Sequence, residues 1–185
     1  MCKRYNSFIF YILMITLLSD CKKQELKVTD VILCDNFSSE GLCREPLQKE
    51  HVYNIIFPLS KNINTWDKFA NYLYFTTRQT PGYILKFNRS FTPGEKKILH
   101  DTFSSSYEFS NSNGHMEGVE IGEDFIGVFN YLGSMVKIRQ KEMKQELMYP
   151  YPGMLFPAKT VFKYKSTLVN GEVDMNLNIL LKYIQ

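Results

Sequence analysis

The stretch from Thr160 to Tyr183 constrains the fold most, because polar and apolar side chains alternate along it on both sides of a turn signal. Phe162 and Tyr164 alternate with lysines before the turn, and polar residues separate the apolar ones after it, which are Val173, Met175, Leu177 and Ile179. A period of two is typical of a strand with one buried face. Asn170 and Gly171, between the two runs, favour a two-residue hairpin turn with positive φ. The sequence therefore predicts a C-terminal β-hairpin that turns at these two residues.

Further strands are predicted wherever branched and aromatic residues cluster, at 29–33, 51–57, 83–87 and 107–109, with a polar loop at 110–114. The stretch 116–133 predicts two strands around a turn at Gly122–Asp124, although its apolar spacing also fits a helix. Gly127 and Gly133 would each cost about 1 kcal/mol inside a helix, so the strands are favoured.

Three segments favour helices. Thr92, Pro93 and Glu95 form the capping-box pattern at the start of one that continues to Phe103. A second begins after Thr65, and its C-terminal half, 72–77, fits a strand as well. The third is a charged, exposed helix at 134–148. These elements predict an α+β domain, in which two or three helices pack on one face of an antiparallel sheet that ends in the C-terminal hairpin.

The N-terminus has the layout of a secretory signal peptide. Lys3 and Arg4 precede an apolar run, Phe8 to Leu18, that only Thr16 interrupts. This run is shorter than the roughly 20 apolar residues that a spanning helix needs, and it matches the apolar region of a signal peptide. We therefore expect residues 1–20 to be removed. The alternative is a buried N-terminal helix of a cytosolic domain.

The residues that end this segment, Leu18-Ser19-Asp20-Cys21, resemble the lipobox of bacterial lipoproteins. Leu18 and Ser19 occupy the third and second positions before the cysteine, as in the family pattern, whereas Asp20 stands where Gly, Ala or Ser is usual. Spirochaetal lipoproteins have a looser lipobox and a similar composition, rich in Lys, Asn and aromatic residues. The resemblance implies acylation of Cys21 and an outer-membrane protein at the cell surface or in the periplasm, but it implies no activity. Two or three acyl chains hold a protein stably on a membrane.

The predicted mature chain consists of a lipidated N-terminus and tether, residues 21–28, and a single globular domain, residues 29–185. Loss of Lys3, Arg4 and Asp20 would leave 20 basic and 18 acidic residues, so the mature chain is nearly neutral. No basic stripe with interleaved aromatics is present. Nucleic acid is therefore not an expected partner.

Cys34 and Cys43 bracket a stretch rich in turn residues. In an oxidising compartment, two thiols this close in sequence are expected to form a disulfide. The alternative is half of a zinc site, but no histidine stands at ligand spacing and two cysteines do not complete four ligands.

The sequence contains no recognisable catalytic motif. The nucleophile elbow and the phosphate-binding glycine loop are absent, and His51, His100 and His115 are scattered. Oxygen-bearing side chains crowd the stretch 111–124, but they lack the order of an EF-hand, so a solvated loop is favoured over a calcium site. We expect no enzyme activity, no metal and no cofactor.

Aromatic residues on the second predicted helix form a candidate interaction surface, namely Trp66, Tyr72 and Tyr74, with Phe75 and Tyr83 nearby in sequence. Such side chains more often fill the core, and that interpretation is favoured for the group as a whole. The leading hypothesis is a lipid-anchored, non-enzymatic envelope protein that binds a protein partner or has a structural role. The alternatives are an envelope hydrolase that uses His115 and neighbouring acidic residues, and an assembly factor that holds a partner at a sheet edge.

Overall fold

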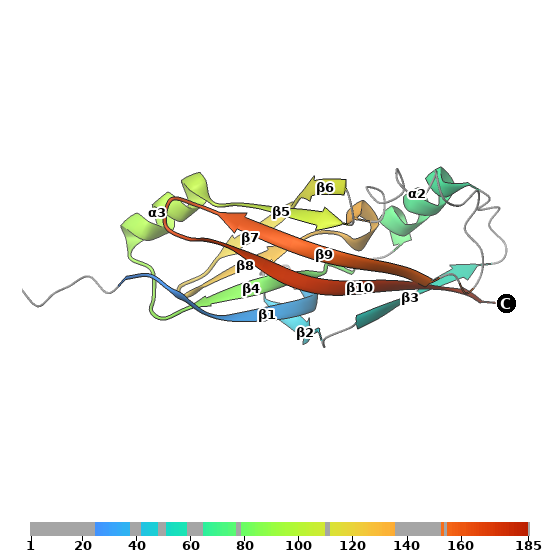
Figure 1. Ribbon diagram of the computed structural model, residues 1–185, viewed down its shortest axis with the longest axis horizontal. Helices are drawn as coiled ribbons and strands as arrows, with labels where there is room; N and C mark the ends of the chain where they lie inside the picture. Colours follow the sequence, from blue (N-terminus) through green and yellow to red (C-terminus); the bar gives the residue numbers. More distant parts are fainter. Residues whose placement is uncertain are drawn as a thin grey trace, which may run out of the picture.

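The fold consists mainly of two five-stranded sheets (Figure 1). It is seen in a computed structural model that describes residues 25–37, 42–47, 51–58, 65–76, 79–109, 112–135, 153 and 155–184. Sheet A has the order β2 (Cys43–Pro46), β1 (Val28–Phe37), β4 (Gly82–Phe87), β8 (Phe125–Phe129) and β7 (Gly118–Ile121). Sheet B has the order β3 (His51–Pro58), β10 (Asn170–Ile184), β9 (Leu155–Lys165), β5 (Ser104–Phe109) and β6 (Ser112–His115). All neighbours are antiparallel except β3 and β10, which are parallel.

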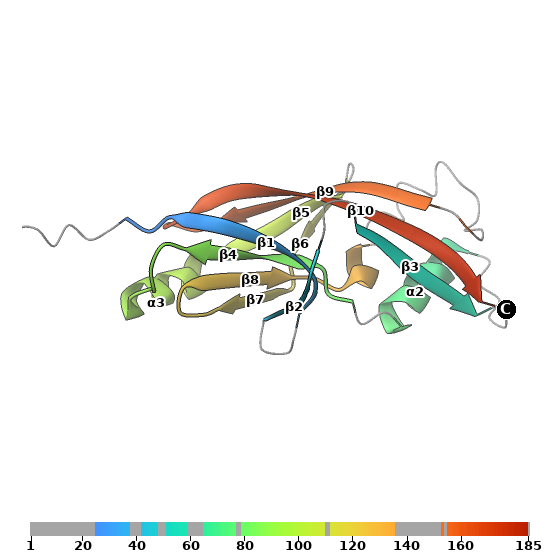
Figure 2. The ribbon, with the colours of Figure 1, turned by 90° about the horizontal axis from the view of Figure 1, so that it is seen from below.

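The two sheets pack face to face around a shared apolar core (Figure 2). Tyr83 of β4 is fully buried, and its ring centroid lies 5.2 Å from that of Phe162 in β9. The hydroxyls of Tyr83 and Ser105 share a hydrogen bond of 2.8 Å across the same interface. The expected α+β arrangement is therefore only partly confirmed. The chain is mostly β, because a second sheet covers the face that the sequence had assigned to helices.

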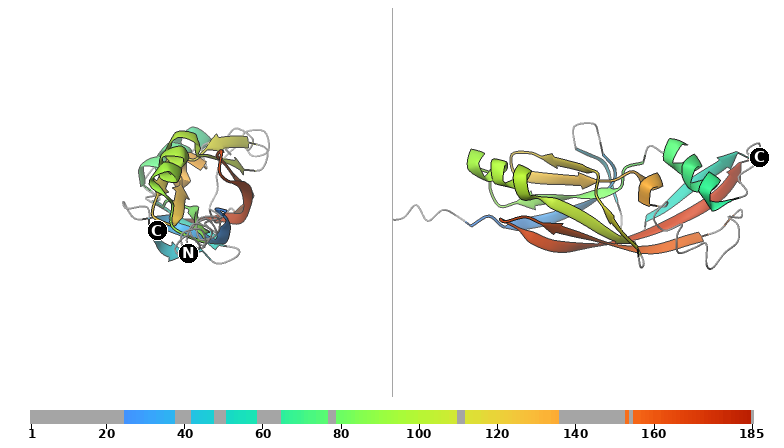
Figure 3. Two further views of the ribbon diagram at one scale, coloured as in Figure 1. Left: turned by 90° about the vertical axis from the view of Figure 1, so that its left-hand side faces the viewer. Right: turned by 90° about the horizontal axis from the view of Figure 1, so that it is seen from above.

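Sheet B extends beyond the region in which the two sheets face each other. From Leu177 onward, β10 pairs with β3, and helix α2 (Trp66–Thr76) covers this extension on the side of sheet A (Figure 3). Phe69 and Leu73 of α2 are fully buried in the shared core. The predicted helix is confirmed, and the strand alternative for its second half is wrong. The Thr65 side chain accepts a hydrogen bond of 3.3 Å from the Lys68 amide, as expected of an N-cap.

Helix α3 (Pro93–Thr102) lies at the opposite end of the molecule from α2 (Figure 1). Its predicted capping box is confirmed. The Glu95 amide donates to Thr92 Oγ1 at 3.2 Å, and the Thr92 amide donates to Glu95 Oε2 at 2.9 Å. Leu99 is buried, whereas Ile98, expected on the same apolar face, is 40% exposed.

The C-terminal strand pair is confirmed, but its predicted turn is wrong. Asn170 pairs with Lys165 and Gly171 with Tyr164, so both turn candidates lie within β10. The loop is 166–169, and the Ser166 hydroxyl accepts hydrogen bonds from the amides of Leu168 and Val169 at 3.1 and 3.0 Å. A Cβ atom on Gly171 would overlap the Tyr164 ring. Gly171 therefore provides space for a neighbouring aromatic ring rather than a positive φ.

The remaining elements mostly follow the sequence. The turn at Gly122–Asp124 joins β7 and β8, so the helix alternative there is wrong. The expected loop at 110–114 is wrong for residues 112–114, which belong to β6 (Ser112–His115). Residues 132 and 133, at the end of the predicted strand, are helical. Residues 134 and 135 are helical as predicted, and the rest of the predicted helix 134–148 lies outside the described residues. Within the described part of the chain, no helix is both long enough and apolar enough to span a bilayer.

Candidate interaction surface

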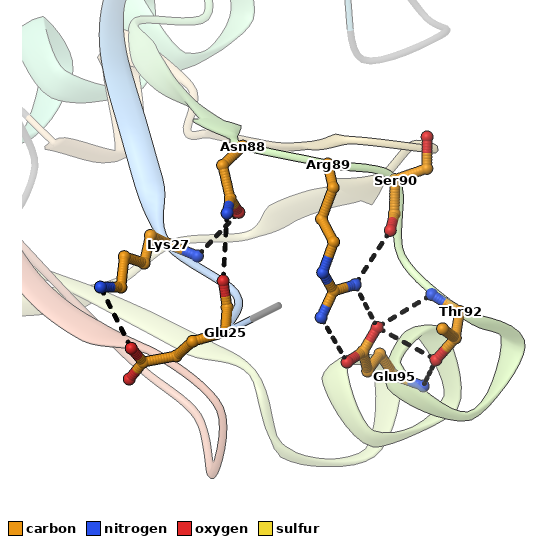
Figure 4. A network of polar contacts seen from close by, with 7 residues as sticks. All are labelled: Glu25, Lys27, Asn88, Arg89, Ser90, Thr92 and Glu95. Atoms are coloured by element: carbon orange, nitrogen blue, oxygen red, sulfur yellow. Dashed lines mark hydrogen bonds and ion pairs between the residues drawn. The ribbon is translucent and has the colours of Figure 1, made fainter. Parts of the chain in front are cut away.

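The first described residues are bound to the body of the protein by Asn88, just after β4 (Figure 4). The Lys27 amide donates to Asn88 Oδ1 at 3.0 Å, and Asn88 Nδ2 donates to the Glu25 carbonyl at 3.1 Å. The Asn88 amide donates to the Lys27 carbonyl at 3.1 Å, and Leu26 packs against the core. We call this arrangement the Asn88 clip. Cys21 lies outside the described residues, but the end of the predicted tether is attached to the body.

A network of charged and polar side chains stands beside the clip (Figure 4). The Arg89 guanidinium donates to both Glu95 carboxylate oxygens, at 2.8 and 2.9 Å. The hydrogen bonds from Arg89, followed by the one from the Thr92 amide, hold the pKa of Glu95 well below its usual range. The Glu95 side chain is 8% exposed, so it accepts these hydrogen bonds in a largely dry position. This network fixes the start of α3 against the end of β4. We call this region, with the clip and the 166–169 loop, the α3 end.

The predicted disulfide is confirmed. Cys34 of β1 and Cys43 of β2 are joined, with their Cα atoms 5.6 Å apart. Cys34 is fully buried on the outer face of sheet A, beside Phe37 and Ile84. The bridge closes the connection between β1 and β2, and it uses both sulfurs that the zinc alternative would need.

The predicted aromatic surface lies on α2, at the opposite end of the molecule from the clip (Figure 1). Tyr72 is half-buried against the core, and the side chains of Trp66 and Tyr74 lie outside the described part of the structure. Tyr83 is fully buried. Phe75 is 79% exposed, the most exposed large apolar side chain described.

Two further apolar side chains are exposed near α2, on the other face of the sheet B extension. Val52 of β3 is 40% exposed, and Leu155, at the start of β9, is 51% exposed. Leu155 lies opposite Leu180, which is half-buried, and Val52 lies opposite Asn178. The sequence does not identify either residue as exposed, because only the register of the strands shows which apolar residues face outward. We call this region, with α2 and β3, the α2 end.

A polar groove of about 300 Å³ crosses the outer face of sheet B. Its lining includes Ser106, Glu108, His115 and Lys163. Ser106 and His115 lie directly opposite each other in the β5–β6 pair, so their side chains share a face. Lys163 Nζ lies 3.6 Å from a carboxylate oxygen of Glu108 and 3.6 Å from one of Glu172.

Ser106 and His115 face the same side of the strand pair, but no hydrogen bond joins their described side chains. In the described ranges, no three His, Cys, Asp or Glu side chains converge as metal ligands would. The acidic residues that follow His115 in the sequence are spread over β7 and its flanking turns.

Comparisons with protein-family models, with curated proteins and with solved structures found no match to this chain.

Proposed function

We propose that this chain is a lipid-anchored, non-enzymatic protein of the bacterial envelope that binds a protein partner. The observation that carries the proposal is the sequence from Phe8 to Cys21, an apolar run of signal-peptide length that ends at a lipobox-like cysteine. The Cys34–Cys43 disulfide supports it, because structural disulfides persist in oxidising compartments.

The α2 end supports the binding role. Phe75, Val52 and Leu155 expose apolar surface there. Aromatic and apolar side chains of this kind are enriched where proteins contact each other. The partner in this proposal is therefore a protein with an apolar contact surface.

Intact mass and fatty-acid labelling of the protein from its native host test the anchor. The wild type should lack residues 1–20 and carry acyl chains, and Cys21→Ala should carry none. Cys2→Ala is the matched control, because Cys2 precedes the apolar run and should leave with it. An unprocessed, unlabelled wild-type chain would reject the proposal.

A second candidate, an envelope hydrolase, is favoured by one observation, the position of Ser106 and His115 opposite each other in the polar groove. It is tested with purified protein on a panel of ester and peptide substrates. Activity that both Ser106→Ala and His115→Ala abolish, while Asn113→Ala at the same groove retains it, would replace the binding role with a hydrolase. Absence of hydrolysis in the wild type would remove this candidate.

A further inference from the structure

We propose that the Asn88 clip holds the α3 end of the anchored protein against the lipid headgroups and directs the α2 end away from the membrane. This inference rests on the proposed acylation of Cys21. It adds to the proposed function which surface of the protein faces the bilayer. It also names Asn88 as the residue that sets the distance between that surface and the acylated cysteine.

The chain between the anchor and the body of the protein is short. Only Lys22, Lys23 and Gln24 separate Cys21 from Glu25, whose carbonyl is the first group bound by Asn88. An extended chain spans at most about 3.3–3.6 Å per residue, so four steps reach roughly 14 Å. The clip therefore keeps Glu25, and with it the clip side of the α3 end, within that distance of the acylated cysteine.

The molecule is much longer than the reach of the tether. Strand β10 begins beside the α3 end and runs to the α2 end (Figures 1 and 2). Its 15 residues, at about 3.3 Å each, span roughly 50 Å. This length is more than three times the reach of the tether, so an upright molecule presents Phe75 and Leu155 far from the bilayer.

The charges on the outer face of sheet B argue against a molecule that lies flat on the membrane. Lysines there lie near carboxylates, Lys159 near Asp174 and Lys163 near Glu108 and Glu172. A polybasic segment gains about 1 kcal/mol per Lys or Arg near an anionic bilayer, but balanced pairs give little of this attraction. At the α3 end, Lys97 pairs with Asp101 at 2.7 Å and Lys27 with Glu25 at 3.1 Å, so these two lysines also give little attraction. The short tether, rather than charge, is what places the α3 end at the headgroups.

Substitution of Asn88 tests the contribution of the clip while leaving the rest of the fold unchanged. Asn88→Ala removes the two side-chain hydrogen bonds and leaves the backbone bond to the Lys27 carbonyl. Release of Glu25 and Leu26 would lengthen the reach by two residues, to about 21 Å. Asn88→Asp is the matched variant, because it keeps an acceptor for the Lys27 amide but replaces the donor to the Glu25 carbonyl with a carboxylate oxygen that repels it.

Fluorescence quenching measures the orientation of the full, acylated chain. A dye is placed on a new cysteine at either end, Gly94→Cys at the start of α3 or Asn71→Cys on α2. Both positions are exposed, and a side chain at position 94 would meet no atom within 4 Å. The vesicles are phosphatidylcholine with a fraction of lipids that carry a nitroxide on the headgroup.

We expect strong quenching at position 94 and none at position 71, with the same result at low and high salt. Insertion of about twelve Gly and Ser residues between Gln24 and Glu25 should abolish the quenching at position 94. Asn88→Ala and Asn88→Asp should both reduce it, because each removes the donor to the Glu25 carbonyl.

The opposite results overturn the inference. Equal quenching at the two positions would show a molecule that lies flat, and unchanged quenching after the insertion would show that the tether does not set the distance. Intact mass of the same samples distinguishes the two proposals. An acylated protein with the wrong quenching pattern refutes the orientation alone, whereas a protein without acyl chains refutes the proposed function and the orientation with it.

Discussion

The two ends of the molecule are held together in different ways. At the α3 end, polar contacts dominate. The Arg89–Glu95 pair and the capping box join neighbours in the sequence, whereas the Asn88 clip joins residues 61 and 63 positions apart. At the α2 end, the helix is held by Phe69 and Leu73, which are buried against strands from distant parts of the chain. That end also leaves Phe75 exposed. Polar contacts, both local and long-range, hold the end proposed to face the membrane, and long-range apolar packing holds the end proposed to meet a partner.

Leu73→Ala tests the apolar packing of the α2 end and is expected to have the largest effect on stability. Leu73 is fully buried, so the truncation should lower the free energy of unfolding by about 2–5 kcal/mol, through lost burial and a residual cavity. Urea denaturation measures the loss, with exposed Asn71→Ala as the control, expected within about 0.5 kcal/mol of wild type. Equal stability of Leu73→Ala and the control would show that α2 does not depend on the sheet beneath it.

Gly171→Ala tests packing near the 166–169 loop at the α3 end. The added methyl group overlaps the Tyr164 ring, and overpacking of this kind costs about 1–3 kcal/mol. The control is Gly94→Ala, whose methyl group meets nothing and should stabilise α3 by about 0.5–1 kcal/mol. Thermal melts of both variants should shift in opposite directions. A shift in the same direction would contradict the assigned role of Gly171.

Glu95→Gln tests the local polar contacts of the α3 end and their pH dependence. Loss of the charged cap should cost about 1 kcal/mol near neutral pH. Because the folded pKa of Glu95 is lowered, its contribution is fully present above the unfolded value of about 4.3 and is lost as the pH falls below it. The melting temperature of the wild type should therefore fall more steeply below about pH 4.3 than that of the variant. Parallel pH profiles would show that the Arg89–Glu95 pair contributes nothing to stability.

Phe75→Ser should have the smallest effect on stability and a clear effect on the surface. Phe75 is 79% exposed, so the free energy of unfolding should stay within about 0.5 kcal/mol of wild type. The variant should elute earlier from a phenyl column, because the apolar surface of the α2 end is reduced. Tyr72→Ser, at a half-buried position on the same helix, should instead destabilise the fold. Unchanged retention of Phe75→Ser would argue against the α2 end as an apolar contact surface.

Elements with strong local signals were predictable from the sequence. The capping box of α3 and the turn at Gly122–Asp124 are where their residues place them, because their geometry involves only neighbours in the chain. The Cys34–Cys43 disulfide follows from two cysteines close in sequence. The hairpin turn was misplaced, since Gly171 faces the Tyr164 ring across the strand pair, a long-range contact that a local turn rule does not include.

The candidate interaction surface was predicted in part. The sequence selected aromatic residues of α2, but it could not separate Phe75, which is exposed, from Tyr83, which is buried. Val52 and Leu155 were missed because apolar residues alternate onto both faces of the strands at that end, and the register of β3, β9 and β10 decides which face is covered.

The sequence by itself determined the period of each strand, the caps of the helices and the short spacing between Cys21 and the first strand, because these depend on covalent neighbours and local backbone geometry. Only the tertiary structure decided that a second sheet covers the first, that α2 covers the extension of sheet B and that Asn88 binds residues 61 and 63 positions away. The physical reason is that apolar burial is non-directional. Alternation shows that a face will be buried, but the partner that buries it depends on contacts between distant parts of the chain.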